Sequence, residues 1–85
     1  MRTYERIPVK TKKYELTDSL TEINTQGLEA IILAEGGDVC LRAQKNASSS
    51  DAFIIKEGTY AYLGGVFWLS GSGATALICF CDLVL

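Results

Sequence analysis

The sequence predicts an all-β protein, a small antiparallel β-sandwich or jelly-roll-like barrel of about eight short strands with an extended N-terminal arm. Glycines and small polar residues interrupt the apolar segments every few residues, a spacing typical of sandwiches and barrels. Hydrophobic residues make up 48% of the 85 residues and charged residues 21%, which is typical of one packed domain. The 24 uncharged residues between Glu57 and Asp82 are long enough for a membrane helix, but five glycines interrupt them, so we expect no membrane span.

The N-terminal residues 1–25 are expected to form an arm or edge strands, and residues 26–85 the β-sandwich domain. Pro8 is the only proline, and proline within a sheet is suited to an edge strand. Further on, Asn24 and Gly27 are typical turn residues. The basic residues of this segment alternate with acidic and aromatic ones, and the net charge of the chain is −2, so we expect no nucleic-acid partner.

The segment from Leu28 to Gln44 predicts an antiparallel hairpin. Apart from Glu29, residues 28–34 are apolar and include two isoleucines, and the letters EGGD follow them. Two adjacent glycines suit a tight turn because glycine takes positive φ without steric cost. After the turn, apolar and polar residues alternate, which indicates a strand with one side in water.

The remaining strands follow in quick succession. The polar residues 45–51 indicate a surface loop. Strands are then expected over AFII, TYAYL, VFWLS and the final ATALICFCDLVL, with the glycines between them as turns.

The final strand is apolar on both faces, and a sandwich core can cover only one of them. The simplest cover for the second face is another subunit. The pattern does not decide which face looks inward: one offers Ile78, Phe80 and Val84, and the other offers Leu77, Leu83 and Leu85.

Few residues suggest catalysis. The chain contains no histidine, which excludes His-dependent triads, and GSGAT lacks the Lys of a phosphate-binding loop. Asp38, Asp51, Glu57 and Asp82 are spread over different turns. We therefore expect a protein that is not an enzyme and that uses no cofactor.

The three cysteines are Cys40, Cys79 and Cys81, and we expect them to be free, buried thiols. Three cysteines without histidine do not make a tetrahedral zinc site within one chain. On a strand, Cys79 and Cys81 would share a face with Cα atoms about 6.6 Å apart, near the upper limit for a disulfide.

Aromatic residues gather in the C-terminal half. Tyr60, Tyr62, Phe67 and Trp68 are expected to pack in the core or at an interface. Alternatively, Tyr60, Tyr62 and Trp68 could form a stacking platform for a glycan.

Three segments in order resemble small accessory virion proteins of tailed bacteriophages. These segments are AIILAEGGDVCLRAQ, NASSSDAFIIKEGTYAYL and VFWLSGSGATALICFCDL. The resemblance covers residues 26–85, and it implies a compact β-sandwich that decorates or stabilises a capsid or tail, or forms part of a head or tail fibre. It further implies packing on major capsid or tail subunits, a place in the virion after assembly in the host cytoplasm, and no catalytic residues. Self-association, as a homotrimer, is expected to use interface candidates Tyr60, Tyr62, Phe67, Trp68, Ile78, Phe80 and Leu83.

Overall fold

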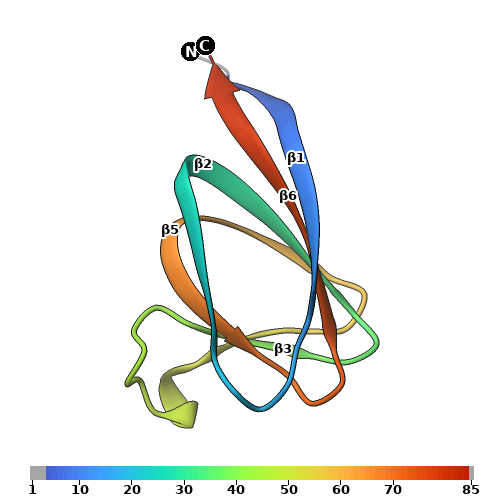
Figure 1. Cartoon of the computed structure of the whole chain (residues 1–85), viewed down its shortest axis with the longest axis vertical. Coiled ribbons are helices and arrows are strands. Elements are labelled where there is room, and N and C mark those ends of the chain that lie inside the picture. Colours follow the sequence, from blue (N-terminus) through green and yellow to red (C-terminus); the bar gives the residue numbers. More distant parts are fainter. Residues whose placement is uncertain (1–3, 85) are drawn as a thin grey trace.

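The computed structural model describes residues 4–84, which form one antiparallel sheet in the strand order β1-β6-β2-β5-β3-β4 (Figure 1). The all-β prediction is confirmed, but within these residues the strands number six and not about eight. Their bounds are β1 Glu5–Glu15, β2 Thr21–Glu35, β3 Val39–Arg42, β4 Phe53–Ile55, β5 Tyr60–Ser70 and β6 Thr75–Val84, with a 3₁₀ turn η1 at Ser49–Asp51.

Two of the expected turns are bends inside long strands, which explains why too many strands were predicted. On β2, Gln26 and Gly27 have φ angles of 52° and 86°, and on β5 Gly65 has a φ of 95°. The register advances from the pair Asn24–Val66 to the pair Glu29–Gly64, so β2 carries extra residues opposite Gly65. Bulged residues of this kind bend a strand and increase its twist without ending it.

The Thr25 side chain bonds the two strands where the backbone ladder is interrupted. Its buried hydroxyl accepts a hydrogen bond from the Gly65 N–H at 2.8 Å and donates one to the Gly65 carbonyl at 3.2 Å. Thr25 is only 1% exposed, and a buried hydroxyl without a partner would cost free energy. The threonine hydroxyl therefore stabilises the bend.

The bend divides the sheet into two halves that share one core. The wide half contains β1, β6, residues 29–35 of β2 and residues 60–64 of β5. The narrow half contains residues 21–24 of β2 and residues 66–70 of β5, together with β3 and β4. Buried side chains of both halves belong to a single hydrophobic cluster. Its members are Leu16, Ile23, Ala30, Ile32, Ala34, Val39, Leu41, Ile55, Phe67, Leu69, Ala74, Ala76, Ile78 and Phe80.

The expected hairpin around EGGD is only partly present. Gly36 and Gly37 do adopt positive φ and the chain does turn there. However, β3 pairs with β4 and β5 and not with β2. Both edges of the second part of β2 are already occupied, by β6 on one side and β5 on the other.

The N-terminal segment is part of the sheet. β1 is an edge strand that pairs with β6 from Glu5–Val84 to Glu15–Thr75, with an irregularity between Pro8 and Lys10. The expected boundary after residue 25 lies inside β2, at its bend. In Figure 1, the beginning of β1 and the end of β6 lie together and extend beyond the other strands. Within residues 4–84 no helix is long and apolar enough to cross a membrane.

Candidate functional site

The outward side of the wide half carries a set of apolar and aromatic side chains. We call it the outer surface, and it consists of Ile31 and Leu33 on β2, Tyr60 and Tyr62 on β5, and Leu77 and Cys79 on β6. Direct register pairs join them: Ile31 lies between Tyr62 and Cys79, and Leu33 lies between Tyr60 and Leu77. Because directly paired residues of adjacent strands lie on the same face of a sheet, these six side chains form one continuous surface.

The exposure of its side chains shows which face of the last strand, β6, points inward and which points outward. Ile78 and Phe80 are buried in the core, whereas Leu77 is half-buried and Leu83 is 40% exposed. The face that starts with Leu77 therefore points outward. Of the other residues named for these faces, Val84 is 36% exposed and Leu85 lies outside the described residues.

Charged residues border the outer surface. Lys13 and Glu15 of β1 pair with Leu77 and Thr75, and Glu35 of β2 also pairs with Thr75. At the opposite end, Arg6 and Glu29 form an ion pair. An apolar centre with a charged rim is the usual composition of a protein interface.

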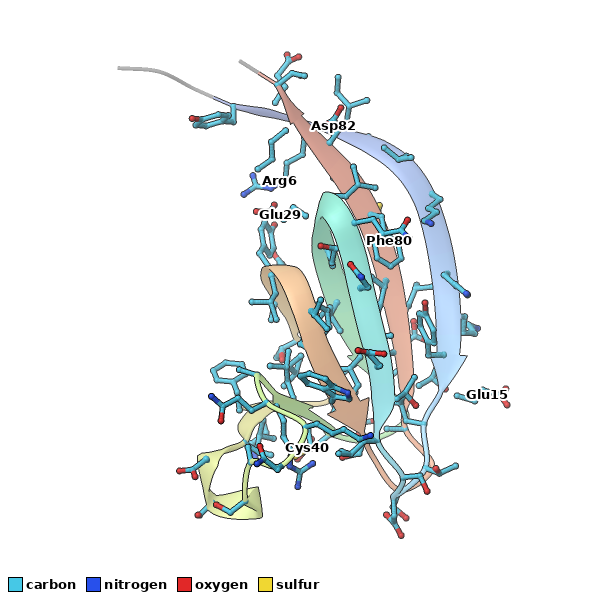
Figure 2. All side chains as sticks on the ribbon, turned by 60° about the vertical axis from the view of Figure 1, so that its left-hand side comes forward. Arg6, Glu15, Glu29, Cys40, Phe80 and Asp82 are labelled. Atoms are coloured by element: carbon cyan, nitrogen blue, oxygen red, sulfur yellow. The ribbon has the colours of Figure 1, made fainter. Side chains whose placement is uncertain are left out.

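Arg6 connects the charged rim to the aromatic pair. Its guanidinium lies 4.6 Å from the centre of the Tyr62 ring, and its Nε donates to Glu29 Oε1 (Figure 2). The hydrogen bond to Glu29 raises the pKa of Arg6. The Tyr62 and Tyr60 rings are 5.7 Å apart and tilted by 32°. One positive charge, one negative charge and two exposed rings thus lie side by side.

The predicted interface residues fall into two groups. Tyr60 and Tyr62 are 61% and 47% exposed, and with Leu83 they are available to a partner. Phe67, Ile78 and Phe80 have less than 4% of their surface exposed and point into the core, which corrects their assignment as interface candidates.

Trp68 does not join the two tyrosines. It is half-buried and lies across the bend of β5, where its register partners are Glu22 and Arg42. The glycan platform predicted from Tyr60, Tyr62 and Trp68 is therefore reduced to the two tyrosines. Sequence reasoning missed Arg6, Glu29, Ile31 and Leu33; the alternation of residues 29–35 could have indicated the last three.

Two of the carboxylates considered for catalysis, Asp38 and Asp51, form hydrogen bonds with neighbouring turn residues. Asp38 accepts a hydrogen bond from the backbone N–H of Glu57 at 2.9 Å and lies 3.5 Å from Lys56 Nζ. The hydrogen bond from Glu57, assisted by the charge of Lys56, lowers the pKa of Asp38. Asp51 accepts a hydrogen bond from Ser48 Oγ, beside η1.

The three cysteines are free. Cys81 is buried, Cys40 and Cys79 are half-buried, and the Sγ atoms of Cys79 and Cys81 are 3.7 Å apart. Burial raises the pKa of the Cys81 thiol, and the neighbouring Cys79 acts in the same direction. In the described part of the chain, no group of three or more histidine, cysteine, aspartate or glutamate side chains is placed to hold a metal ion.

An apolar pocket of about 220 Å³ adjoins the outer surface. Leu41, Phe53, Ala61, Tyr62 and Leu63 line it. Of these residues, Phe53 lies on the short edge strand β4 and is 61% exposed.

No family model, no curated protein and no solved structure matches the chain.

Proposed function

We propose that the chain is a non-enzymatic structural protein of a tailed-bacteriophage virion, which self-assembles as a trimer through its outer surface and packs on capsid or tail subunits. In this proposal the two halves of the bent sheet act as the two layers of a small sandwich. The observation that carries it is the outer surface itself. It presents six apolar or aromatic positions on three adjacent strands, bordered by charges of both signs.

Burial of the outer surface provides the driving force for assembly. A large apolar side chain that leaves water contributes about 1.5–3 kcal/mol, and a half-buried one contributes part of that. Because every subunit of a closed ring makes the same contact with its neighbour, these small contributions add up over the copies. They must exceed the entropy lost on association. The partner class, a capsid or tail subunit, rests on the sequence resemblance of residues 26–85.

The test compares lysine substitutions on the two sides of the sheet. Tyr60→Lys and Leu83→Lys place a charge on the outward side, and we expect folded protein of smaller mass. Phe80→Lys places the charge in the core, and we expect an unfolded chain. Gln44→Lys, in an exposed loop, is the matched control and should assemble like the wild type.

Light scattering coupled to size-exclusion chromatography gives the mass, and circular dichroism reports folding. A wild type that stays monomeric at high micromolar concentration contradicts self-assembly. Mass spectrometry of purified virions tests the location, and absence of the chain from them contradicts the virion assignment.

A second candidate function, glycan binding, is favoured by one observation. Tyr60 and Tyr62 present adjacent exposed rings, and the Arg6–Glu29 pair beside them offers a hydrogen-bond donor and an acceptor. Aromatic faces stack on sugar rings, and charged groups bind hydroxyls. A glycan array distinguishes the two functions: specific binding that Tyr60→Ala abolishes supports the second, and no binding removes it.

A further inference from the structure

Cys79 and Cys81 form a close pair with unequal access to solvent. Their Sγ atoms are 3.7 Å apart, which is van der Waals contact, and both lie on the outward side of β6. Cys79 is half-buried, whereas Cys81 is only 1% exposed. Burial of Cys81 is unexpected, because most residues on this side of the sheet retain some exposure.

The ion pair between Arg6 and Glu29 lies on the same side of the sheet as Cys81. Glu29 is the register partner of Cys81 on β2, and Arg6 is the register partner of Leu83 on β1, two residues further along the same face. By this register, a bond between Arg6 and Glu29 spans β6 on the side of the sheet that carries Cys81. Figure 2 shows the Arg6 and Glu29 side chains next to each other. The pair is therefore placed to cover Cys81 and not Cys79.

We propose that Cys79 and Cys81 are a reversible dithiol site, in which Cys79 attacks a low-molecular-weight disulfide and Cys81 resolves the mixed disulfide. Cys79 loses its proton to water, and its thiolate attacks one sulfur of oxidised glutathione. The glutathione S–S bond breaks, and one glutathione thiolate leaves and takes up a proton. Cys81, deprotonated in turn, attacks the Cys79 sulfur and releases the second glutathione. Two protein thiols are oxidised to one disulfide, and one glutathione disulfide is reduced to two thiols.

The strand geometry makes this disulfide easy to reduce. Bond formation brings the two sulfurs from 3.7 Å to about 2.05 Å. An extended strand keeps Cα atoms two residues apart at about 6.6 Å, near the upper end of the range that disulfides span. Strained disulfides have more oxidising potentials and are the labile ones. Millimolar reduced glutathione should therefore reopen the bond.

The dithiol site does not depend on the proposed function. Cys79 belongs to the outer surface, so assembly would cover it, and the reaction is that of the free chain. The experiment is run at two protein concentrations, one below and one above the association midpoint. Slower oxidation in the concentrated sample reports assembly, while oxidation in the dilute sample tests the dithiol by itself.

The experiment treats folded wild-type protein with oxidised glutathione and maps the products by mass spectrometry after tryptic digestion. Cleavage after Lys56 places Cys79 and Cys81 in one peptide and Cys40 in another. We expect the C-terminal peptide to lose the mass of two hydrogens and to regain it with reduced glutathione. Cys81→Ser should instead accumulate a glutathione adduct at Cys79, and Cys79→Ser should remain largely unmodified. Cys81→Ala replaces Cys81→Ser should the serine variant not fold.

Glu29→Gln tests the cover over Cys81. In the Cys79→Ser background this change should speed modification of Cys81 several-fold, while Glu22→Gln, an exposed glutamate on the same strand, should not. Absence of the intramolecular disulfide in dilute wild type overturns the proposal. Equal glutathione adduct formation by Cys79→Ser and Cys81→Ser overturns the assignment of the attacking thiol.

Discussion

The inner and outer sides of β2 and β6 are both apolar, but they differ in side-chain size. On the inner side, Ala30, Ala34 and Ala76 alternate with Ile32, Ile78 and Phe80, and all six are buried. On the outer side the corresponding positions are larger on average and include Ile31, Leu33 and Leu77, all half-buried. Side chains of the narrow half, such as Ile23 and Phe67, belong to the same buried cluster as these small residues.

This difference shows that small side chains identify the covered side of a bent sheet. Hydrophobicity alone does not, because β6 is apolar on both faces between Thr75 and Cys81. Close packing requires that the two halves interdigitate, and alanine beside isoleucine provides the space. The outer side has no such constraint on side-chain size.

The largest expected effect on stability comes from truncating two adjacent isoleucines, one on the inner side of β2 and one on the outer side. Ile32→Ala removes a fully buried side chain, and we expect a loss of about 2–5 kcal/mol in the free energy of unfolding. Ile31→Ala, its neighbour on the outer side, removes the same atoms from a half-buried site and should cost less than about half as much. Urea denaturation followed by circular dichroism measures both. Equal losses would mean that the outer side is covered as well.

A smaller effect is expected at the bend that brings the two halves together. Thr25→Val keeps the side-chain shape but removes both hydrogen bonds to Gly65. Each hydrogen bond contributes about 0.5–1.5 kcal/mol, so we expect the loss of both to lower the free energy of unfolding by about 1–3 kcal/mol. Thr25→Ser retains the hydroxyl and is the control. Should valine prove as stable as threonine, the bend would depend on its glycines and not on the hydroxyl.

The smallest effect concerns pH, at Asp38. Its pKa in the folded chain is lowered below the ordinary value of 3.8 by the hydrogen bond from Glu57. The carboxylate therefore adds stability that is fully present above about pH 4 and is lost as pH falls through the folded-state pKa. Asp38→Asn should remove this contribution, so that wild type and variant converge in melting temperature at low pH. The measurement is thermal melting between about pH 2.5 and 6. A difference in melting temperature that does not change with pH would contradict the role of Asp38.

The sequence predicted the strand class and many strand positions because these depend on local pattern. Alternation along residues 74–84 placed Ile78 and Phe80 on one face and Leu77 and Leu83 on the other, as observed. Which face is inner depends on the bend near Gly27 and Gly65, and these residues are distant from β6 in sequence. A glycine with positive φ either ends a strand or bends it, and the local sequence is the same in both cases.

Which strands pair with one another was harder to predict from the sequence than where the strands lie. The turn at Gly36 and Gly37 was expected to join two paired strands, but β2 already has β5 and β6 as neighbours. The outer surface likewise combines side chains of three strands from different parts of the chain. The ion pair of Arg6 with Glu29 depends on the register of β1 and β2 against β6, and no local pattern contains that register.

The strand order has a consequence for how the chain folds during synthesis. β1 pairs only with β6 within residues 4–84, and Glu5 has Val84 as its register partner. β6 also lies between β1 and β2, so these two strands are not joined in the sheet until residues 75–84 have left the ribosome. Non-local pairing of this kind slows folding relative to hairpins that form between neighbours in sequence. Until then β2 can pair with β5 but has no partner on its other edge. The sheet is therefore completed only after nearly all of the described residues have been translated.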